Sequence, residues 1–178
     1  MKKKLYWQSP FLIFLIVGTV FIVRQQRSTP YQHDEGQVFG TFYHITYQND
    51  SSLNNDILAE LDKVDNALSM FNDKSIISRV NRGENVETND MFNAVFNLAE
   101  QIADNTNGSF DITVAPLVNT WGFGFKTGNP PSKMTIDSLR SIVGYKKVSL
   151  HNNHITKTDP RIMLDCSAIA KGYGCDVV

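Results

Sequence analysis

Apolar and polar residues alternate along residues 38–47, which is the pattern of a β-strand. Phe39, Tyr43 and Ile45 share one parity. Gly40 would interrupt this strand, and a glycine inside a strand is typical of a bulge or of close approach by another group. We therefore predict that the folded domain begins with a strand near residue 38.

Three later segments repeat apolar residues at spacings of three and four, which predicts amphipathic helices. The first covers residues 53–68, with Ser51 or Ser52 as its N-cap. The second begins near Asp90 and ends at Asn107 and Gly108, and the third runs from a Thr135 N-cap to Gly144. Their apolar positions are Leu53, Ile57, Leu61, Val64 and Leu68; Phe92, Val95, Ala99 and Ile102; and Ile136, Leu139 and Ile142.

The pattern changes after the third helix to short β-like runs at residues 147–150, 154–157 and 162–164. Asn152 with Asn153, and Asp159 with Pro160, separate these runs, so two hairpin-like turns are implied. Together the elements predict an α+β domain with helices packed on a largely antiparallel sheet.

The N-terminus has the pattern of a membrane segment. Lysines at positions 2–4 precede a nearly uninterrupted apolar run from Phe11 to Val23. We interpret residues 1–27 as a membrane anchor or signal segment, and favour an uncleaved anchor because charged and amide residues follow the run. A buried core helix is the alternative. Lysines at the front favour a cytoplasmic N-terminus, which would place the domain on the periplasmic or external side of the membrane.

The polar residues 28–37 contain Pro30 and Gly36 and show no apolar period, so we predict a tether between the anchor and a domain at 38–178. The chain has 178 residues, of which 42% are hydrophobic and 20% charged, as in a folded globular protein. Its formal net charge of -1 supplies no field for a polyanion, so nucleic acid is excluded as the main partner.

The two cysteines, Cys166 and Cys175, do not have the paired spacing of a zinc site. We favour separate buried thiols without a catalytic role. A disulfide closing a short loop is the alternative in an oxidising compartment.

Residues 164–173 follow a strand-like run and have the pattern of a strand, a turn and the start of a helix. Free backbone N–H groups at a helix N-terminus attract phosphate, and Lys171 would add a counter-charge one turn further on. Small Ser167 and Ala168 would allow a ligand to approach closely. The same residues also fit an ordinary helix start with a surface lysine, and this alternative stays open.

These segments, in this order, resemble the FAD:protein FMN transferase (ApbE-like) family, formerly described as thiamine-biosynthesis lipoproteins. The resemblance extends from Phe39 to the last residue and implies a T-fold-like domain, incomplete in this chain. Its landmarks are Gly40, Thr41 and Ile45; Leu68, Ser69, Met70 and Phe71; Ser75, Ile77, Ser78, Arg79, Val80 and Asn81; Gly108, Phe110, Asp111, Thr113, Pro116 and Leu117; Trp121, Gly122 and Phe123; and Leu164, Asp165, Ile169, Ala170, Lys171, Gly172, Tyr173 and Asp176.

The resemblance implies a set of flavin-binding positions and one metal position. FAD would contact Phe39, Phe71, Ser109, Phe110, Asp111, Asp165 and Lys171, and the backbone carbonyl of Ala168 would be one ligand of Mg²⁺. Many family members have methionine in place of Phe39 and tyrosine in place of Phe71. Members of the family are about twice as long, so the resemblance implies that this chain is an N-terminal portion and that the remaining metal ligands lie beyond Val178.

The resemblance further implies magnesium-dependent transfer of FMN from FAD to a threonine or serine hydroxyl of a partner flavoprotein, with release of AMP. The partners would be acceptor flavoproteins of membrane redox complexes. The alternatives are an electron-transfer or flavin-binding protein that keeps FAD intact, a FAD pyrophosphatase, and a tethered structural domain without a ligand. We expect the 178-residue chain by itself to be inactive.

Overall fold

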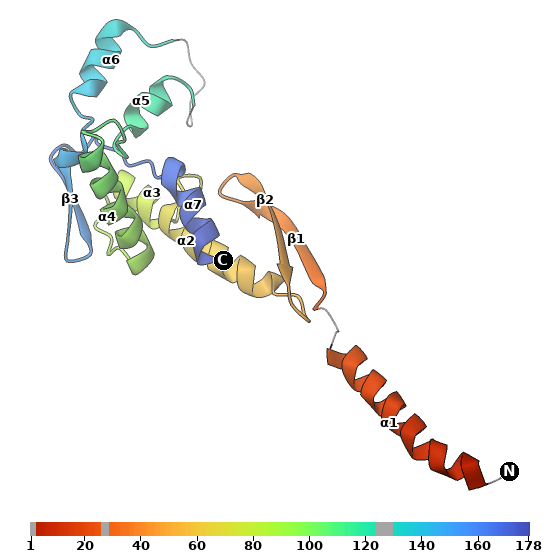
Figure 1. Cartoon of the computed structure of the whole chain (residues 1–178). Helices are drawn as coiled ribbons and strands as arrows, with labels where there is room; N and C mark the ends of the chain where they lie inside the picture. The colour runs from red at the N-terminus through yellow and green to blue at the C-terminus, as the bar shows by residue number, and fades with distance from the viewer. Residues whose placement is uncertain (1–2, 26–28, 124–129) are drawn as a thin grey trace. The chain divides into compact units, whose positions relative to one another are not determined.

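The computed structural model describes residues 3–25, 29–123 and 130–178 (Figure 1). The chain divides into two compact units, which are described separately. One unit comprises Met1–Asp34 with His44–Leu53, and the other comprises Glu35–Tyr43 with Asn54–Val178.

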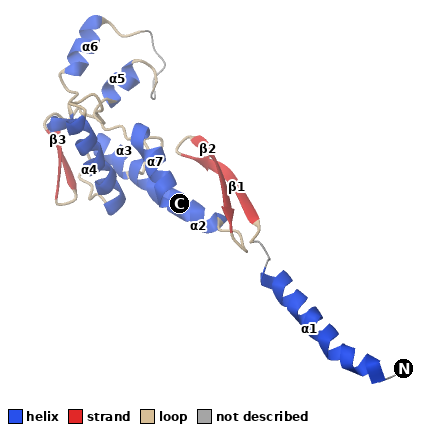
Figure 2. Ribbon diagram, in the orientation of Figure 1, coloured by secondary structure: helices blue, strands red, loops and turns tan. Residues whose placement is uncertain are grey.

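Helices predominate among the described residues, with four short strands (Figure 2). The α+β class is therefore confirmed. In chain order the elements are α1 (Lys3–Gln25), β1 (Tyr31–Val38), β2 (Thr41–Gln48), α2 (Asn54–Leu68), α3 (Ile76–Asn81), α4 (Asp90–Asn105), α5 (Ala115–Thr120), α6 (Lys133–Arg140), the 3₁₀ turn η1 (Tyr145–Lys147), β3 (Val148–His151), β4 (His154–Lys157) and α7 (Ser167–Val177).

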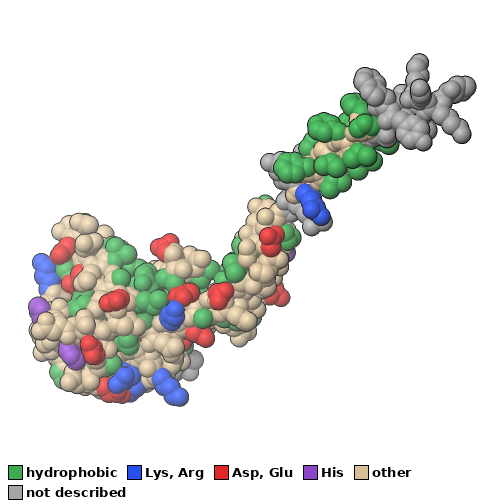
Figure 3. Space-filling view, turned by 90° about the horizontal axis from the view of Figure 1, so that it is seen from below, with side chains coloured by type: hydrophobic (Ala, Val, Ile, Leu, Met, Phe, Trp, Pro, Cys, Tyr) green, Lys and Arg blue, Asp and Glu red, His purple; other side chains and the backbone are tan. Residues whose placement is uncertain are grey.

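The N-terminal helix α1 carries a run of exposed apolar side chains. Between Phe11 and Val23 the large apolar side chains are 48% to 74% exposed, and they cover the surface of α1 in Figure 3. Among the described helices, however, none is both long enough and apolar enough to cross a membrane. The transmembrane anchor predicted over residues 1–27 is thus not supported, and residues 1, 2 and 26–28 lie outside the described residues.

The predicted tether is in part a strand. Residues 31–38 form β1, which pairs with β2. A sequence pattern did not reveal β1 because polar contacts with β2 stabilise it in place of an apolar face. The Tyr47 hydroxyl donates to Asp34 at 2.6 Å, and His33 Nδ1 lies 3.0 Å from the Thr46 hydroxyl.

The predicted strand over residues 38–47 is also wrong at its beginning, because the chain turns there. Val38 ends β1, Thr41 begins β2, and Phe39 and Gly40 between them have φ angles of 54° and 69°. Two consecutive positive φ angles are the conformation of a type I′ hairpin turn. Gly40 therefore marks a turn and not a bulge. A bulky residue such as Phe39 rarely adopts positive φ, at a cost of roughly 1–2 kcal/mol.

The core of the second unit lies among α2, α4 and α7, which pack against one another, with α3 against α2 (Figure 1). The first two predicted helices are confirmed as α2 and α4. Asn89 caps α4 by accepting a hydrogen bond from the Phe92 N–H. Fully buried side chains from α2, α3 and α4 and from the last third of the chain meet in this core, among them Val64, Ile77, Val95, Ile162 and Leu164.

Several predicted details differ from the structure. Ser132, and not Thr135, caps the third helix, because its hydroxyl accepts from the Thr135 N–H. In the last turn of α4, Ala103 is buried, whereas Ile102, which was predicted to lie on the buried face, is only half-buried. Residues 162–164 do not form a strand and make only a single parallel bridge, between Met163 and Val114.

The predicted single sheet is replaced, within the described residues, by two separate two-stranded sheets, β1–β2 and β3–β4. The β3–β4 hairpin is confirmed, with Val148 opposite Lys157 and positive φ angles at Asn152 and Asn153. Buried helices, and not a broad sheet, therefore position the elements around the candidate site.

Both cysteines are free, as we expected. Cys166 lies in the core directly before α7, and burial raises the pKa of its thiol to about 12, with a further contribution from the Asp165 carboxylate. Its thiolate is therefore scarce at neutral pH, which is consistent with a packing role. Cys175 is exposed, contrary to the prediction that both thiols are buried.

Candidate functional site

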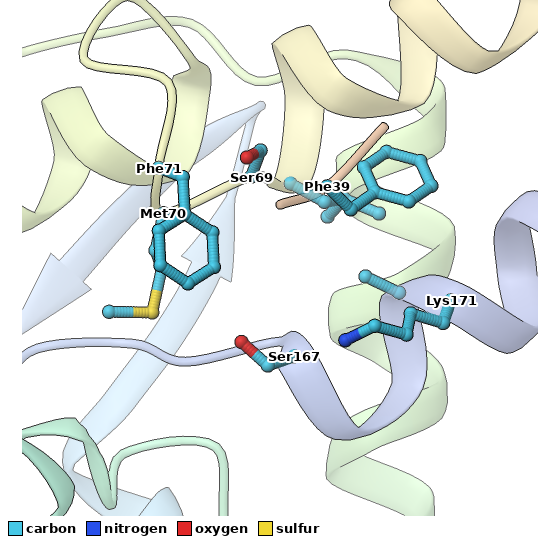
Figure 4. A pocket seen from close by; sticks show the side chains of 8 residues that line it. Phe39, Ser69, Met70, Phe71, Ser167 and Lys171 are labelled. Atoms are coloured by element: carbon cyan, nitrogen blue, oxygen red, sulfur yellow. The ribbon is translucent and has the colours of Figure 1, made fainter. Parts of the chain in front are cut away.

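A pocket opens where the first turn of α7 faces the end of α2 (Figure 4). Phe39 and Phe71 contribute apolar walls, while Ser69, Ser167 and Lys171 contribute the polar groups. In the close-up, Ser69 lies between the two rings and faces Ser167 and Lys171 across the pocket. Three residues predicted from distant parts of the sequence, Phe39, Phe71 and Lys171, are thus brought together.

A second pocket adjoins the first, and the two share Met70, Phe71 and Ser167. Its lining is completed by Asp165, by Val118 and Asn119, and by the largely exposed Phe123. We call the two pockets together the α7 site. Their volumes are about 20 and 40 Å³, so each has room for a few atoms and not for a fused ring system. A planar ligand would have to lie along the exposed rings, with only its polar atoms in the pockets.

The start of α7 is fixed by hydrogen bonds from both sides. The Asp165 N–H donates to the Ile112 carbonyl at 2.7 Å, and the Asp165 carboxylate accepts from the Ser167 N–H at 2.8 Å. The side chain of Asn81, at the end of α3, binds the backbone of Leu164, the residue before Asp165. Asn81 Oδ1 accepts from the Leu164 N–H at 2.7 Å, and Asn81 Nδ2 donates to the Leu164 carbonyl at 2.9 Å. The helix N-terminus is therefore preorganised.

We predict that Asn81→Ala destabilises the fold by about 2–3 kcal/mol, because it leaves both backbone groups of fully buried Leu164 without a partner. Asn81→Asp keeps the acceptor and should cost less. The exposed Asn105→Ala serves as a control, with an expected change within about 0.5 kcal/mol. Chemical denaturation of the three variants measures these differences, and equal stability of Asn81→Ala and wild type would contradict the role of this clamp.

Phe39 enters the first pocket because of the hairpin turn at its own position. Its ring packs against α7 at Gly174, where an added Cβ would lie 3.0 Å from Phe39 Cε2. Gly174 therefore makes room for the ring. The Phe71 ring lies beside the same turn, 3.5 Å from the position of a Cβ at Gly40. Phe71 is 62% exposed at the pocket.

Lys171 supplies a positive charge at the α7 site. No ion pair within the described ranges involves this lysine, although three acidic side chains elsewhere in them pair with lysine or arginine at 2.6–2.8 Å, namely Glu60, Glu84 and Asp159. Its ammonium, together with the partial positive charge of the α7 N-terminus, favours an anionic or acceptor-rich ligand. Asp165 lies on the other side of Ser167, in the second pocket.

The predicted flavin contacts at residues 109–111 lie next to Ile112, whose carbonyl accepts from the Asp165 N–H, but outside the lining of the two pockets. None of the three lines either pocket. Asp111 instead organises its own loop: its carboxylate accepts hydrogen bonds from the N–H and hydroxyl of Thr113, at 2.8 and 2.6 Å, and from the Tyr145 N–H at 2.9 Å. These hydrogen bonds give the Asp111 carboxylate a structural role, because they join its own loop to the turn at Tyr145.

Ala168, the predicted magnesium ligand, lies exposed in the first turn of α7. Its carbonyl is a neutral oxygen that also belongs to the hydrogen-bond ladder of the helix. Within the described residues, no group of three or more histidine, cysteine, aspartate or glutamate side chains is placed to hold a metal ion. These residues therefore do not form a complete magnesium site, since Mg²⁺ requires near-octahedral oxygen ligands.

Sequence reasoning assigned no role at the site to three residues that shape it: Ser69 and Asn81, which were only landmarks of the family resemblance, and Asn119. Ser69 and Asn119 each line one of the pockets, and each has a buried side-chain oxygen without a hydrogen-bond partner among the described residues. A serine between apolar Leu68 and Met70 is a weak signal. Nothing in the sequence around Asn119 distinguishes it from other polar residues of a short helix.

Comparison with known proteins agrees with this architecture and with the earlier resemblance. The sequence profile of the ApbE family matches residues 39–178. The FAD:protein FMN transferase of Haemophilus influenzae is 34% identical over an alignment of 183 positions, which spans 93% of this chain and 53% of that protein. The chain belongs to the ApbE family.

Solved structures show the same fold. The flavin transferase ApbE from Vibrio cholerae superposes with a TM-score of 0.77 at 30% identity, covering 83% of this chain and 52% of the other. The apo flavinyl transferase ApbE from Pseudomonas stutzeri gives a TM-score of 0.75 at 25% identity, with 85% and 52% covered. The chain thus spans about half the length of the relatives that it matches.

Proposed function

We propose that this protein contributes the flavin-binding half of a magnesium-dependent FAD:protein FMN transferase. The observation that carries the proposal is the α7 site, where Phe39, Phe71 and Lys171 meet at a helix N-terminus. The aromatic lining of the site suits an isoalloxazine or adenine ring, and Lys171 suits the pyrophosphate. Membership of the ApbE family supports the same ligand.

In the proposed reaction, the hydroxyl oxygen of a threonine or serine on the acceptor attacks the phosphorus of the FMN half of FAD. The bond between that phosphorus and the bridging oxygen breaks, a phosphodiester forms, and AMP leaves with the bridging oxygen while the hydroxyl loses its proton. Lys171 would hold the phosphates and offset their charge, and the apolar rings would orient the flavin. This chain covers about half the length of its relatives. We propose that the remaining magnesium ligands belong to a region that corresponds to the other half.

We further propose that the acceptors are flavoproteins of membrane redox complexes. Support for an acceptor protein comes from the names of the relatives, which are FAD:protein FMN transferases. The choice of a redox complex follows from the resemblance stated above.

The fate of FAD tests the proposed reaction. Residues 39–178 would replace the matching half of the Haemophilus influenzae relative, and the hybrid would be incubated with FAD, Mg²⁺ and an acceptor flavoprotein. We expect the acceptor to gain the mass of one FMN group, with equimolar AMP. Free FMN without modified acceptor would indicate a pyrophosphatase, and intact FAD in a folded hybrid would indicate a flavin-binding protein; either result would overturn the proposal.

We also propose that the protein works at the bacterial cell envelope, held at the inner membrane through its N-terminal segment with the domain on the periplasmic or external side. What supports this is the exposed apolar surface of α1, since surfaces of this kind are normally covered by lipid or a partner. After alkaline extraction we expect the 178-residue protein in the membrane fraction and a variant lacking residues 1–27 in the soluble fraction. Recovery of both in the soluble fraction would contradict this proposal.

A further inference from the structure

Ser69 combines deep burial with an unused hydrogen-bonding group. The residue is only 6% exposed and lines the first pocket, yet its hydroxyl has no hydrogen-bond partner among the described residues. Buried hydroxyls are normally paired, and leaving one unpaired is costly. The serine therefore carries a cost in the ligand-free protein.

The backbone of Ser69 is held in place by hydrogen bonds on both sides of the residue. The Ser69 N–H donates to the Asp65 carbonyl at 3.0 Å. The Ser69 carbonyl accepts from the hydroxyl of Ser75 at 2.6 Å, and Ser75 in turn caps α3 by accepting from the Ser78 N–H at 3.1 Å. The main chain at Ser69 is thus fixed from both sides, which fixes the position of its Cβ at the pocket wall.

The groups across the pocket from Ser69 indicate which kind of ligand atom could form a hydrogen bond with its hydroxyl. Across the pocket lie Ser167 and the ammonium of Lys171 (Figure 4). A ligand atom drawn to this cation is an acceptor, so Ser69 would act as the donor. The pocket volume of about 20 Å³ admits one small polar group and excludes a ring.

We propose that the Ser69 hydroxyl donates a hydrogen bond to an acceptor oxygen of bound FAD, and so helps to position the ligand. We assign that oxygen either to a carbonyl of the flavin ring or to a phosphate, two acceptors of FAD that would suit a position beside the Lys171 ammonium. This inference rests on the proposed function, because it takes FAD as the occupant of the α7 site. The pocket would then distinguish FAD from a flat apolar ligand of similar size.

The test compares Ser69→Ala with wild type in the 178-residue protein, using calorimetric titration and thermal unfolding. We expect Ser69→Ala to bind FAD about fivefold to tenfold more weakly, the effect of one lost hydrogen bond. Its unfolding temperature should be unchanged or higher, because the unpaired hydroxyl is gone. Ser75→Ala makes the same chemical change at a neighbouring buried serine whose hydroxyl is paired, and it should unfold at a lower temperature.

Titrations with riboflavin and with ADP identify the acceptor oxygen. A loss of affinity shared by riboflavin supports a ring carbonyl, and a loss shared by ADP supports a phosphate. Unchanged FAD affinity of Ser69→Ala, or weaker binding with a lower unfolding temperature, would overturn the role of Ser69 while leaving FAD binding by wild type intact. Absence of FAD binding by wild type would instead overturn the proposed function, and this inference with it.

Discussion

Replacing Lys171 with glutamine is expected to weaken FAD binding by about ten- to a hundredfold, the usual effect of removing a hydrogen bond to a charged group. Thermal stability should change little, because Lys171 is exposed and forms no ion pair within the described residues. Wild-type affinity should also fall with added salt, whereas the variant should be less sensitive. Titration calorimetry at two ionic strengths measures both effects.

Lys133→Gln offers a matched control for this prediction. Lys133 is an exposed lysine in α6 that lines neither pocket, so its replacement should leave FAD affinity and salt dependence unchanged. Equal weakening by both variants would indicate a general charge effect. Wild-type affinity in Lys171→Gln would show that this lysine is an ordinary surface residue.

The 178-residue chain by itself is expected to transfer no FMN when supplied with FAD, Mg²⁺ and an acceptor. The only predicted metal ligand on it is the neutral carbonyl of Ala168, and no carboxylate cluster accompanies it among the described residues. One neutral oxygen cannot replace the hydration shell of Mg²⁺. A bound pyrophosphate would then lack most of the charge stabilisation that transfer requires.

Intact-mass measurement of the acceptor checks this result, with the Haemophilus influenzae relative as the positive control. The control reaction should modify the acceptor, and the 178-residue chain should leave its mass unchanged over the same period. An acceptor that gains one FMN group from the 178-residue chain would mean that this half holds a sufficient set of metal ligands.

The helices could be predicted from the sequence because their apolar spacing is long and regular. Asp90 marks the start of α4 as expected, and Asn107 and Gly108 adopt the positive φ angles that end a helix. The strand β1 could not be predicted in this way, because its stability comes from pairing with β2 and from polar contacts such as Tyr47 to Asp34. Those contacts depend on the register of the hairpin, which an apolar pattern does not encode.

The site was predictable only in part. Phe39, Phe71 and Lys171 were expected from the family resemblance, and the structure brings them to one pocket. The Asp111 network could not be read from the sequence, because its partner Tyr145 comes from a distant turn. The unpaired hydroxyl of Ser69 is likewise a property of packing, which only the three-dimensional structure reveals.

Hydrogen–deuterium exchange with and without FAD most directly tests the claim that FAD binds at the α7 site. We expect FAD to slow exchange at residues 68–71 and 165–171, the two segments that supply most of the pocket lining, and to leave the β3–β4 hairpin at residues 148–157 unchanged. Slower exchange confined to that hairpin, or no change at residues 68–71 and 165–171 at saturating FAD, would contradict the claim.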